Sequence, residues 1–473
     1  MLLVCLDTVR PDRTSLAGAR DTTPALAALA RSGTTFDLAF SPGNESLYAH
    51  AALFTGRWPS EVAVPTYTRF GVPDATPTLA DALRRGGYRT AAFTGGGHVV
   101  ASFGFDAGFD TFEAASEDFG SLFDSVPRAL AWIGTADERP WFAFVHGYDA
   151  HTPWTAPGPF LHRWAEAPAR PEVEQIAADP LAIERVRADV GGGAWFAERP
   201  LDDLTHVAGR RLLGLAAYEE PWTRRADEHV VPLAASDVAH LRDHYDGGVS
   251  YGDAWLAVLL AEVDLRSTVV VVVADHGEDL FDHGVANHRA GLWDSTTRVP
   301  MVAAGPGFPA GARVSAFTDL RDVAPTLLAA AGLSPLAGAA GVDLRHVASG
   351  ELPGHTAVYA EGVLGMVSVR DREGRLTARV RLDDAADVAS LADAPIDGGR
   401  FSLWDVPDTG DRLRTPDAAA RARAESLRAS LLAWRATLIP SDRGLDSAEG
   451  DARREQLRRE GYSFEPGPGT AGP

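Results

Sequence analysis

Short, fully apolar runs recur along the chain, and helical patterns separate them. The run at residues 268–274 is almost pure valine, and Leu2–Leu6 and residues 141–145 are similarly apolar. A strand without polar alternation is buried on both faces, which is typical of parallel sheets covered by helices. The fold class is therefore predicted to be α/β, with a large, mostly parallel sheet and helices on both of its faces.

Other segments complete this predicted body. Strands are expected at residues 88–93 and 299–304. Helical periodicity, with Pro or Gly near the helix ends, predicts helices at residues 23–31, 49–55, 76–85, 237–263 and 324–331.

The pattern changes at two places, and these changes suggest the domain organisation. Residues 1–350 form the predicted catalytic body, and a Pro-, Ala- and charge-rich stretch at 158–237 is predicted to be a helical insertion or lid. Residues 351–440 are predicted to form a smaller antiparallel sheet plus a helix. Residues 441–473 form a tail, and its Gly- and Pro-rich end is expected to be disordered.

Composition excludes several classes of protein. The 473 residues carry a formal net charge of −21, which argues against a nucleic-acid partner. No lysine occurs, so Schiff-base and P-loop chemistry are excluded. The single cysteine, Cys5, excludes an intrachain disulfide and is expected to pack as a small apolar residue.

The chain offers no predicted membrane span, because no apolar run approaches the length that crosses a bilayer. The first strand follows Met1 directly, without the apolar core of a secretory leader. The sequence as written therefore predicts a cytoplasmic protein, and a start inside the first strand leaves open whether residues precede it.

Polar residues follow the predicted strands at the edge where parallel sheets bind ligands. Asp7 follows the first strand, and Asp275-His276 follow the valine strand. Carboxylate and imidazole ligands together suit a divalent metal ion. Either carboxylate alone could cap a turn, but their occurrence at two strand ends favours the metal site.

Ser46 precedes a predicted helix and allows two interpretations. It could cap the helix, or it could be a nucleophile where backbone N–H groups hold an anion. The chain contains no Gly-x-Ser-x-Gly elbow and no His-Glu-x-x-His motif, which disfavours an α/β-hydrolase and a zincin.

Several motifs in a fixed order resemble the sulfatase family of the alkaline phosphatase superfamily. They are LDTVRPD at 6–12, TPAL at 23–26, SLYAHAALFTG at 46–56, VHGYDAHTP at 145–153, ADHGE at 274–278, GLWD at 291–294, RVP at 298–300, DVAPTL at 322–327 and SLWD at 402–405. The resemblance extends over nearly the whole chain outside the insertion and the tail, and it implies an alkaline-phosphatase-like fold.

The resemblance also implies roles for individual residues. One divalent ion (calcium, manganese or magnesium) would be held by Asp7, Asp275, His276 and Ser46, with Ser46 also the nucleophile. Histidines would handle the substrate or leaving group at His151 and His288, and His50 stands where relatives have arginine or histidine. We expect substrate-binding roles for Arg10, His146 and Arg289, and supporting roles for Thr8 and Glu278.

The family's activating signature is Cys or Ser, any residue, Pro or Ala, any residue, Arg. Tyr48 and His50 replace its two anchor positions, so Ser46 is expected to remain serine rather than become formylglycine. A serine sulfate must be released by attack of water at sulfur, whereas a phosphoserine is released more readily. Unmodified serine therefore favours phosphate, and the overall resemblance favours sulfate.

The expected function is metal-dependent hydrolysis of small anionic sulfate or phosphate esters, by in-line attack of Ser46. The alternatives are a phospho-group transferase, or a phosphodiesterase or phosphonate hydrolase, of the same superfamily. A non-catalytic binding protein with this fold is disfavoured because Asp7, Asp275 and His276 are all present. The sequence does not predict the oligomeric state.

Overall fold

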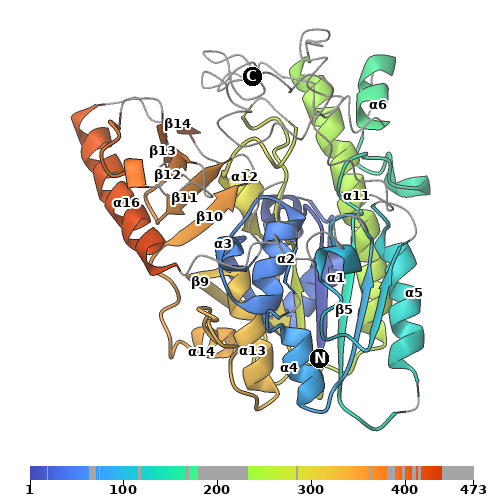
Figure 1. The fold of residues 1–473 in the computed structure, drawn as a ribbon. Coiled ribbons are helices and arrows are strands. Elements are labelled where there is room, and N and C mark those ends of the chain that lie inside the picture. Colours follow the sequence, from blue (N-terminus) through green and yellow to red (C-terminus); the bar gives the residue numbers. More distant parts are fainter. Residues whose placement is uncertain are drawn as a thin grey trace, which may run out of the picture.

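The predicted α/β class is confirmed by a computed structural model. It describes residues 1–178 and 233–438, apart from gaps at 19, 63–70, 74, 116–118, 136, 166–169, 284–285, 363–364, 381–388, 397–399, 407–411 and 414–416. In this part of the chain, nine strands form one large sheet with the order β4-β3-β5-β1-β6-β8-β2-β7, and β9 pairs with β2. Figure 1 shows this sheet inside a shell of helices, with a second sheet at its side.

The first strand of the chain lies in the middle of the large sheet. β1 (Leu2–Leu6) pairs in parallel with β5 (Trp141–Gly147) and with β6 (Val270–Val273). β3 (Arg89–Thr94) and β4 (Thr111–Ala114) extend the parallel part on the β5 side. The core of the protein is therefore built around the valine strand and the start of the chain.

The other half of the sheet is mixed. β8 (Met301–Ala304) runs antiparallel to β6 and to β2 (Gly33–Phe40), and β9 (Ala312–Asp319) runs parallel to β2. The strand predicted at 299–304 is split, because Pro300 has no N–H to give to a ladder. Its first part is the short β7 (Arg298–Val299), which pairs with the end of β2.

Helices cover both faces of the sheet. One face carries α1 (Pro24–Ser32), α5 (Leu122–Ile133) and α11 (Ala235–Ala261). The other carries α2 (Ser46–Thr55), α4 (Leu79–Arg85) and α13 (Val323–Ala330). Shorter helices complete the body at α3 (Pro59–Val62), α12 (Asp294–Thr297) and α14 (Leu344–Ala348).

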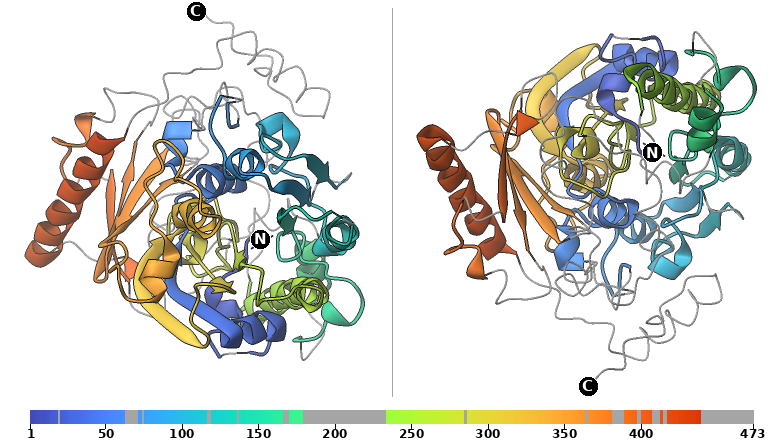
Figure 2. Two further views of the ribbon diagram at one scale, coloured as in Figure 1. Left: turned by 90° about the horizontal axis from the view of Figure 1, so that it is seen from below. Right: turned by 90° about the horizontal axis from the view of Figure 1, so that it is seen from above.

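The second sheet is antiparallel and follows the body in sequence, as predicted. It consists of β10 (Val358–Gly362), β11 (Met366–Arg370), β12 (Gly374–Arg379), β13 (Phe401–Asp405) and β14 (Arg412–Leu413). The long helix α16 (Ala418–Thr437) covers its outer face (Figure 2), where Leu427 and Leu431 pack against Val367 and Val369.

Part of the predicted insertion is described. It contains a short turn of helix at Gly158–Phe160 and the helix α6 (Pro171–Ala178), which contacts α11. Its remainder, at 179–232, and the predicted tail at 441–473 lie outside the described residues. The boundaries of insertion, subdomain and tail stay predictions.

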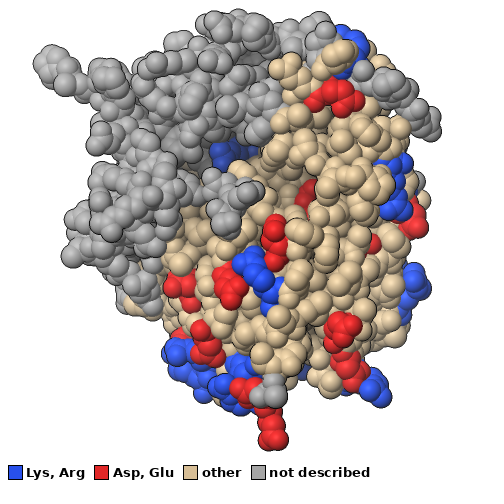
Figure 3. Space-filling model, turned by 90° about the vertical axis from the view of Figure 1, so that its right-hand side faces the viewer, with Lys and Arg blue, Asp and Glu red and all other residues tan. Residues whose placement is uncertain are grey.

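Two surface properties complete the description. On the face that carries α5, α6 and α11, acidic and basic side chains are scattered and often adjacent (Figure 3). Among the described helices, none combines the length and the apolar character that a bilayer crossing requires.

Candidate active site and metal centre

Two strand ends of the large sheet bring Asp7 and Asp275 together. Cys5 pairs with Val273 between β1 and β6, so each aspartate lies two residues beyond the same rung of the ladder. The backbone N–H of Thr8 donates to Asp275 Oδ1 at 3.3 Å, which ties the first strand end to the second. Both carboxylates are fully buried.

Thr8 holds an uncommon backbone conformation at this point. Its φ is 57°, a left-handed value that costs a β-branched residue about 1–3 kcal/mol. Two hydrogen bonds fix it: Thr8 Oγ1 donates to the Asp7 carbonyl at 2.8 Å, and the Tyr245 hydroxyl donates to the Thr8 carbonyl at 2.7 Å. The turn therefore directs the chain away from β1 immediately after the Asp7 side chain.

Ser46 is the first residue of α2 and contacts this pair. Its Oγ lies 3.0 Å from Asp7 Oδ2 and 3.4 Å from His276 Nε2. The N-cap position is occupied by Glu45, so Ser46 lies inside the helix rather than at its cap. Ser46 therefore lies in the first turn of α2, where backbone N–H groups lack intrahelical partners and can attract an anion.

The donor set fits a divalent metal ion. Ligand atoms of Asp7, Asp275 and His276 all lie within 4.8 Å of one another. The Nδ1 atom of His276 lies 2.9 Å from the Gly277 carbonyl, so Nδ1 carries the proton and Nε2 presents a lone pair to the carboxylates. Asp7 Oδ1 and Asp275 Oδ2 are buried without a hydrogen-bond partner among the described residues.

The electrostatics agree with that chemistry. Burial and the adjacent Asp275 charge raise the pKa of Asp7 well above its usual value. Burial opposes ionisation of Asp275 too, but His276 and His50 outweigh it and hold the pKa of this carboxyl low. Two buried carboxylates in contact ionise together only next to a cation. The residues present therefore fit the metal that the sulfatase resemblance implies.

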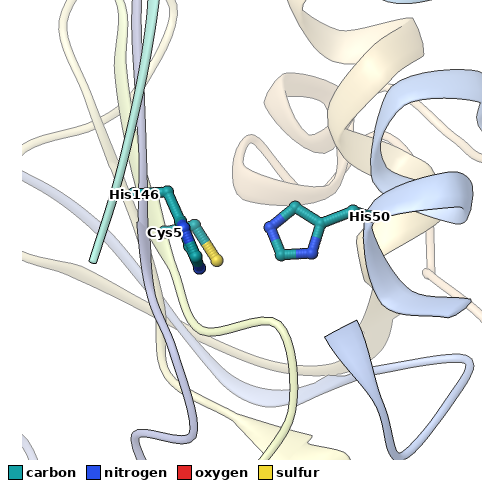
Figure 4. A group of neighbouring side chains, drawn as sticks. All are labelled: Cys5, His50 and His146. Carbon is teal, nitrogen blue, oxygen red and sulfur yellow. The ribbon is translucent and has the colours of Figure 1, made fainter. Parts of the chain in front are cut away.

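A second layer, formed by Cys5, His50 and His146, lies beside this centre. His50 points from α2 toward Cys5 on β1 and His146 on β5 (Figure 4), and ligand atoms of the three lie within 4.8 Å. His50 Nδ1 lies 2.8 Å from the Ser46 carbonyl, and His146 Nε2 lies 3.5 Å from Asp7 Oδ2. All three side chains are fully buried, which lowers the pKa of both histidines.

The geometry of this second layer limits what His50 and His146 can do. His50 contacts the Ser46 carbonyl and His146 lies beside Asp7, so both adjoin the nucleophile and a metal ligand, and their predicted roles stay predictions. Cys5 contacts these histidines as well as apolar residues, and burial raises the pKa of its thiol well above the usual value.

His151 and His288 lie near His276 and near each other. The His288 ring lies 4.4 Å from that of His276 and 5.5 Å from that of His151, measured between centroids. His151 stacks on Phe119, and its Nδ1 lies 2.7 Å from the Thr152 carbonyl. Burial lowers the pKa of His151 to about 4 and that of His288 well below its usual value, so both are neutral at pH 7.

Supporting contacts hold His288 in place. Its Nδ1 lies 3.3 Å from Glu278 Oε2, and the Asn44 amide donates to its backbone carbonyl at 2.9 Å. Asn44 was not selected from the sequence, although it lies two residues before Ser46 in the same loop. Its polar side chain close to a candidate nucleophile is the sequence signal that could have identified Asn44.

The two predicted substrate-binding arginines occupy different environments. Arg10 is buried, makes a bidentate pair with Asp12 and also pairs with Asp282. Arg289 pairs with Glu45 at 3.0 Å, directly before Ser46. The charge of Arg10 is therefore compensated by two carboxylates, and Arg289 is tied to the residue that precedes Ser46.

Tyr245 is a further residue that sequence reasoning missed. Its hydroxyl accepts from the Arg10 N–H at 2.9 Å and donates to the Thr8 carbonyl, and so links α11 to the turn after Asp7. Local sequence gives no signal for this contact, because it joins positions more than 230 residues apart.

Comparisons with known proteins agree with the fold. The family model described as Sulfatase matches residues 1–333. The chain is 24% identical over 359 residues to a Δ4,5-hexuronate-2-O-sulfatase of Bacteroides thetaiotaomicron, an alignment that covers 68% of this chain and 66% of that protein. It thus spans slightly less than two thirds of that relative's length.

Solved structures show the same architecture. A protein in complex with its substrate D-glucosamine-2-N,6-O-disulfate superposes with a TM-score of 0.67 at 16% identity, over 94% of this chain and 99% of that one. A phosphonate monoester hydrolase from Silicibacter pomeroyi superposes with a TM-score of 0.66 at 20% identity, over 93% and 96%.

Proposed function

Because the chain belongs to the sulfatase family, we propose that it hydrolyses small anionic esters of sulfuric or phosphoric acid, with unmodified Ser46 as the nucleophile. The contact that carries this proposal is Ser46 Oγ at 3.0 Å from Asp7 Oδ2, at the start of α2. A hydroxyl held by a carboxylate at a helix N-terminus is placed to attack the central atom of a bound oxyanion.

Each group at the site has a distinct task in the first step. Asp7 Oδ2 takes the Ser46 hydroxyl proton as Oγ attacks the ester, and it returns this proton to Oγ when the acid is released. The first-turn N–H groups of α2 receive the ester's non-bridging oxygens. The bond from Oγ to phosphorus or sulfur forms while the bond to the leaving oxygen breaks in line with it.

Asp7, Asp275, His276 and Ser46 would hold one divalent ion (calcium, manganese or magnesium), which supplies positive charge to the ester oxygens and lowers the pKa of the hydroxyl.

His151 and His288 move protons on the leaving-group side. Each has its Nδ1 beside an acceptor oxygen, of Thr152 and of Glu278 respectively, so Nε2 is the atom that faces the reaction. Because both rings are neutral with the proton on Nδ1, Nε2 presents a lone pair, and the leaving oxygen takes its proton from solvent in the first step. In the second step Nε2 takes a proton from the water that releases the acid from Ser46, and loss of that proton to solvent restores the starting state.

We place phosphate or phosphonate esters ahead of sulfate esters as substrates. Tyr48 and His50 occupy the anchor positions of the formylglycine signature, and both are buried in the helix packing. A seryl sulfate lacks the second hydroxyl through which formylglycine expels sulfate.

An activity panel tests this proposal. Aryl sulfate, phosphate monoester, phosphodiester and phosphonate monoester substrates are assayed with Ca²⁺, Mn²⁺ and Mg²⁺, each with the wild type, Ser46→Ala and Asp275→Asn. The proposal requires turnover of at least one ester class that both substitutions abolish. Turnover unaffected by Ser46→Ala would overturn it, and products formed only with an added alcohol would identify a transferase instead.

A further inference from the structure

A second group of ligand-type side chains lies away from the active site, where the insertion meets the body. Glu174 is on α6, and His240 and His244 are one turn apart on the same side of α11. The two helices lie side by side at the upper right of Figure 1. The ligand atoms of all three residues lie within 4.8 Å of one another.

The atoms of this cluster converge on one point. Glu174 Oε1 lies 2.8 Å from His240 Nε2, and Glu174 Oε2 lies 3.4 Å from His244 Nε2. The two Nε2 atoms are themselves 2.9 Å apart. One carboxylate and two imidazole nitrogens therefore face a common centre from two helices.

Hydrogen bonds among Glu174, His240 and His244 cannot satisfy all three side chains at once. His244 Nδ1 lies 3.2 Å from the Trp154 carbonyl, so Nδ1 carries the proton and Nε2 presents a lone pair. A carboxylate and the His244 lone pair then compete for the single proton that His240 Nε2 can offer. A cation at the centre would satisfy all three ligands at once.

The groups around this cluster resemble those around metal ligands in proteins. A backbone carbonyl that accepts the second N–H of a ligating histidine fixes its tautomer and orientation. Both histidines are buried, whereas the Glu174 side chain is 38% exposed, so the cluster lies at the protein surface on its carboxylate side. Arg170 pairs with Asp237 at 2.5 Å and fixes the same two segments next to the cluster.

We propose that Glu174, His240 and His244 bind a zinc-type divalent transition-metal ion that clamps α6 onto α11. Two imidazole nitrogens and one carboxylate oxygen are a common zinc set, with water in the fourth position, and they bind late first-row ions more tightly than calcium or magnesium. The site is distinct from the Asp7 centre, and its existence does not depend on the proposed activity.

The proposed ion has a structural consequence. The Trp154 carbonyl that orients His244 lies three residues after His151, and Tyr245, the next residue on α11, holds the turn at Thr8. An ion at this point would therefore fix the base of the insertion to the two loops that flank the active site.

Metal titration of the full-length chain tests the proposal. Chelator-treated Asp275→Asn protein, in which the Asp7 centre is impaired, is titrated with Zn²⁺ by calorimetry and with Co²⁺ by visible absorption. We expect about one zinc equivalent and the absorption bands of low-coordinate Co²⁺. Adding Glu174→Gln or His240→Gln should weaken zinc binding by more than about 100-fold, because each removes a ligand rather than an outer partner.

A matched control uses the exposed pair His346 and Glu351, whose Nδ1 and Oε2 atoms are 2.6 Å apart. His346→Gln should leave zinc affinity unchanged. Glu174 is partly exposed, so Glu174→Gln is expected to fold even if a histidine variant does not. Zinc binding that survives Glu174→Gln, or no stoichiometric binding by the parent, would overturn the proposal.

Discussion

Buried carboxylates occur in two regions of this molecule with opposite surroundings. Where the small sheet joins the body, Asp294 is paired with Arg370 at 2.9 Å and also with Arg375, and Glu361 is paired with Arg435 at 2.9 Å. At the strand ends of the large sheet, Asp7 and Asp275 each keep a buried oxygen without a hydrogen-bond partner in the described part of the chain.

This difference separates a structural junction from a binding site. At the junction, the protein supplies the compensating charge itself, and burial without it would destabilise the fold. At the strand ends, no arginine among the described residues pairs with Asp7 or Asp275, so we assign the compensating charge to a bound cation. Substitutions in the two regions should therefore affect different properties.

The largest expected effect is on turnover, from Ser46→Ala. Loss of the nucleophile should reduce the rate by several orders of magnitude, as measured by kcat/KM on the best ester of the panel. Because Ser46 does not cap α2, the melting temperature should shift by no more than a few degrees. A fall in melting temperature large enough to explain the lost activity would contradict this assignment.

The next effect distinguishes the two regions by stability. Asp294→Asn should lower the free energy of unfolding by about 3 kcal/mol, because it removes the carboxylate charge that pairs with the buried Arg370 and Arg375. Asp275→Asn should change the stability of metal-free protein by less than about 1 kcal/mol, because Oδ1 can still accept from Thr8 and His276.

Chemical denaturation without added metal measures both values, and elemental analysis measures bound metal. Asp275→Asn should lose the metal of the Asp7 centre, whereas Asp294→Asn should keep it. Equal destabilisation by the two substitutions would remove the distinction between the regions.

The free energy of unfolding should depend on pH through His355, which pairs with Asp322. Hydrogen bonding and charge from Asp322 and Asp319 overcome the burial of His355 and raise its pKa to about 9. Since the folded pKa lies above the unfolded value near 6.5, the contribution to stability is complete below about pH 6.5 and is lost as pH rises through 9.

Unfolding of wild type and His355→Gln at pH 6 and pH 9.5 measures this contribution. The wild type should lose about 1–3 kcal/mol more than the variant over that range. An equal loss of unfolding free energy in wild type and variant would show that the charge of His355 does not stabilise the protein.

The smallest effect concerns Cys5. Burial and the charges of Asp275 and Asp7 raise the pKa of its thiol, so it should stay protonated and inaccessible. Thiol reagents should leave native turnover unchanged over hours and should label Cys5 only after denaturation. Rapid inactivation with labelling of the native protein would contradict this expectation.

The strand-end residues could be predicted because their signal is local. An apolar run followed at once by Asp7 or by Asp275-His276 identifies both a buried strand and its ligand edge. Other elements were missed because their residue types are unusual for the structure that they form. β2 contains Gly33, two threonines and Asp37, which are not typical of a buried strand. α5 contains Pro127, which is not typical of a helix interior.

Contacts that depend on tertiary structure were beyond the sequence. The histidines His240 and His244 show helical spacing, but nothing local links them to Glu174 on another helix. Likewise, the pairing of Arg10 with Asp12 and Asp282 depends on the loop after β6 returning to the loop after β1. Its substrate-binding role remains a prediction, and so do the roles of His151, His288 and Arg289.

The central claim is that serine at position 46 forms a covalent bond to the transferred acid. The direct test is mass spectrometry of the peptide that contains Ser46, from resting enzyme and from enzyme quenched during turnover of the best ester. We expect unmodified serine at rest and a phosphoryl, phosphonyl or sulfo adduct on Ser46 during turnover. Formylglycine at position 46, or an adduct on another residue, would contradict it.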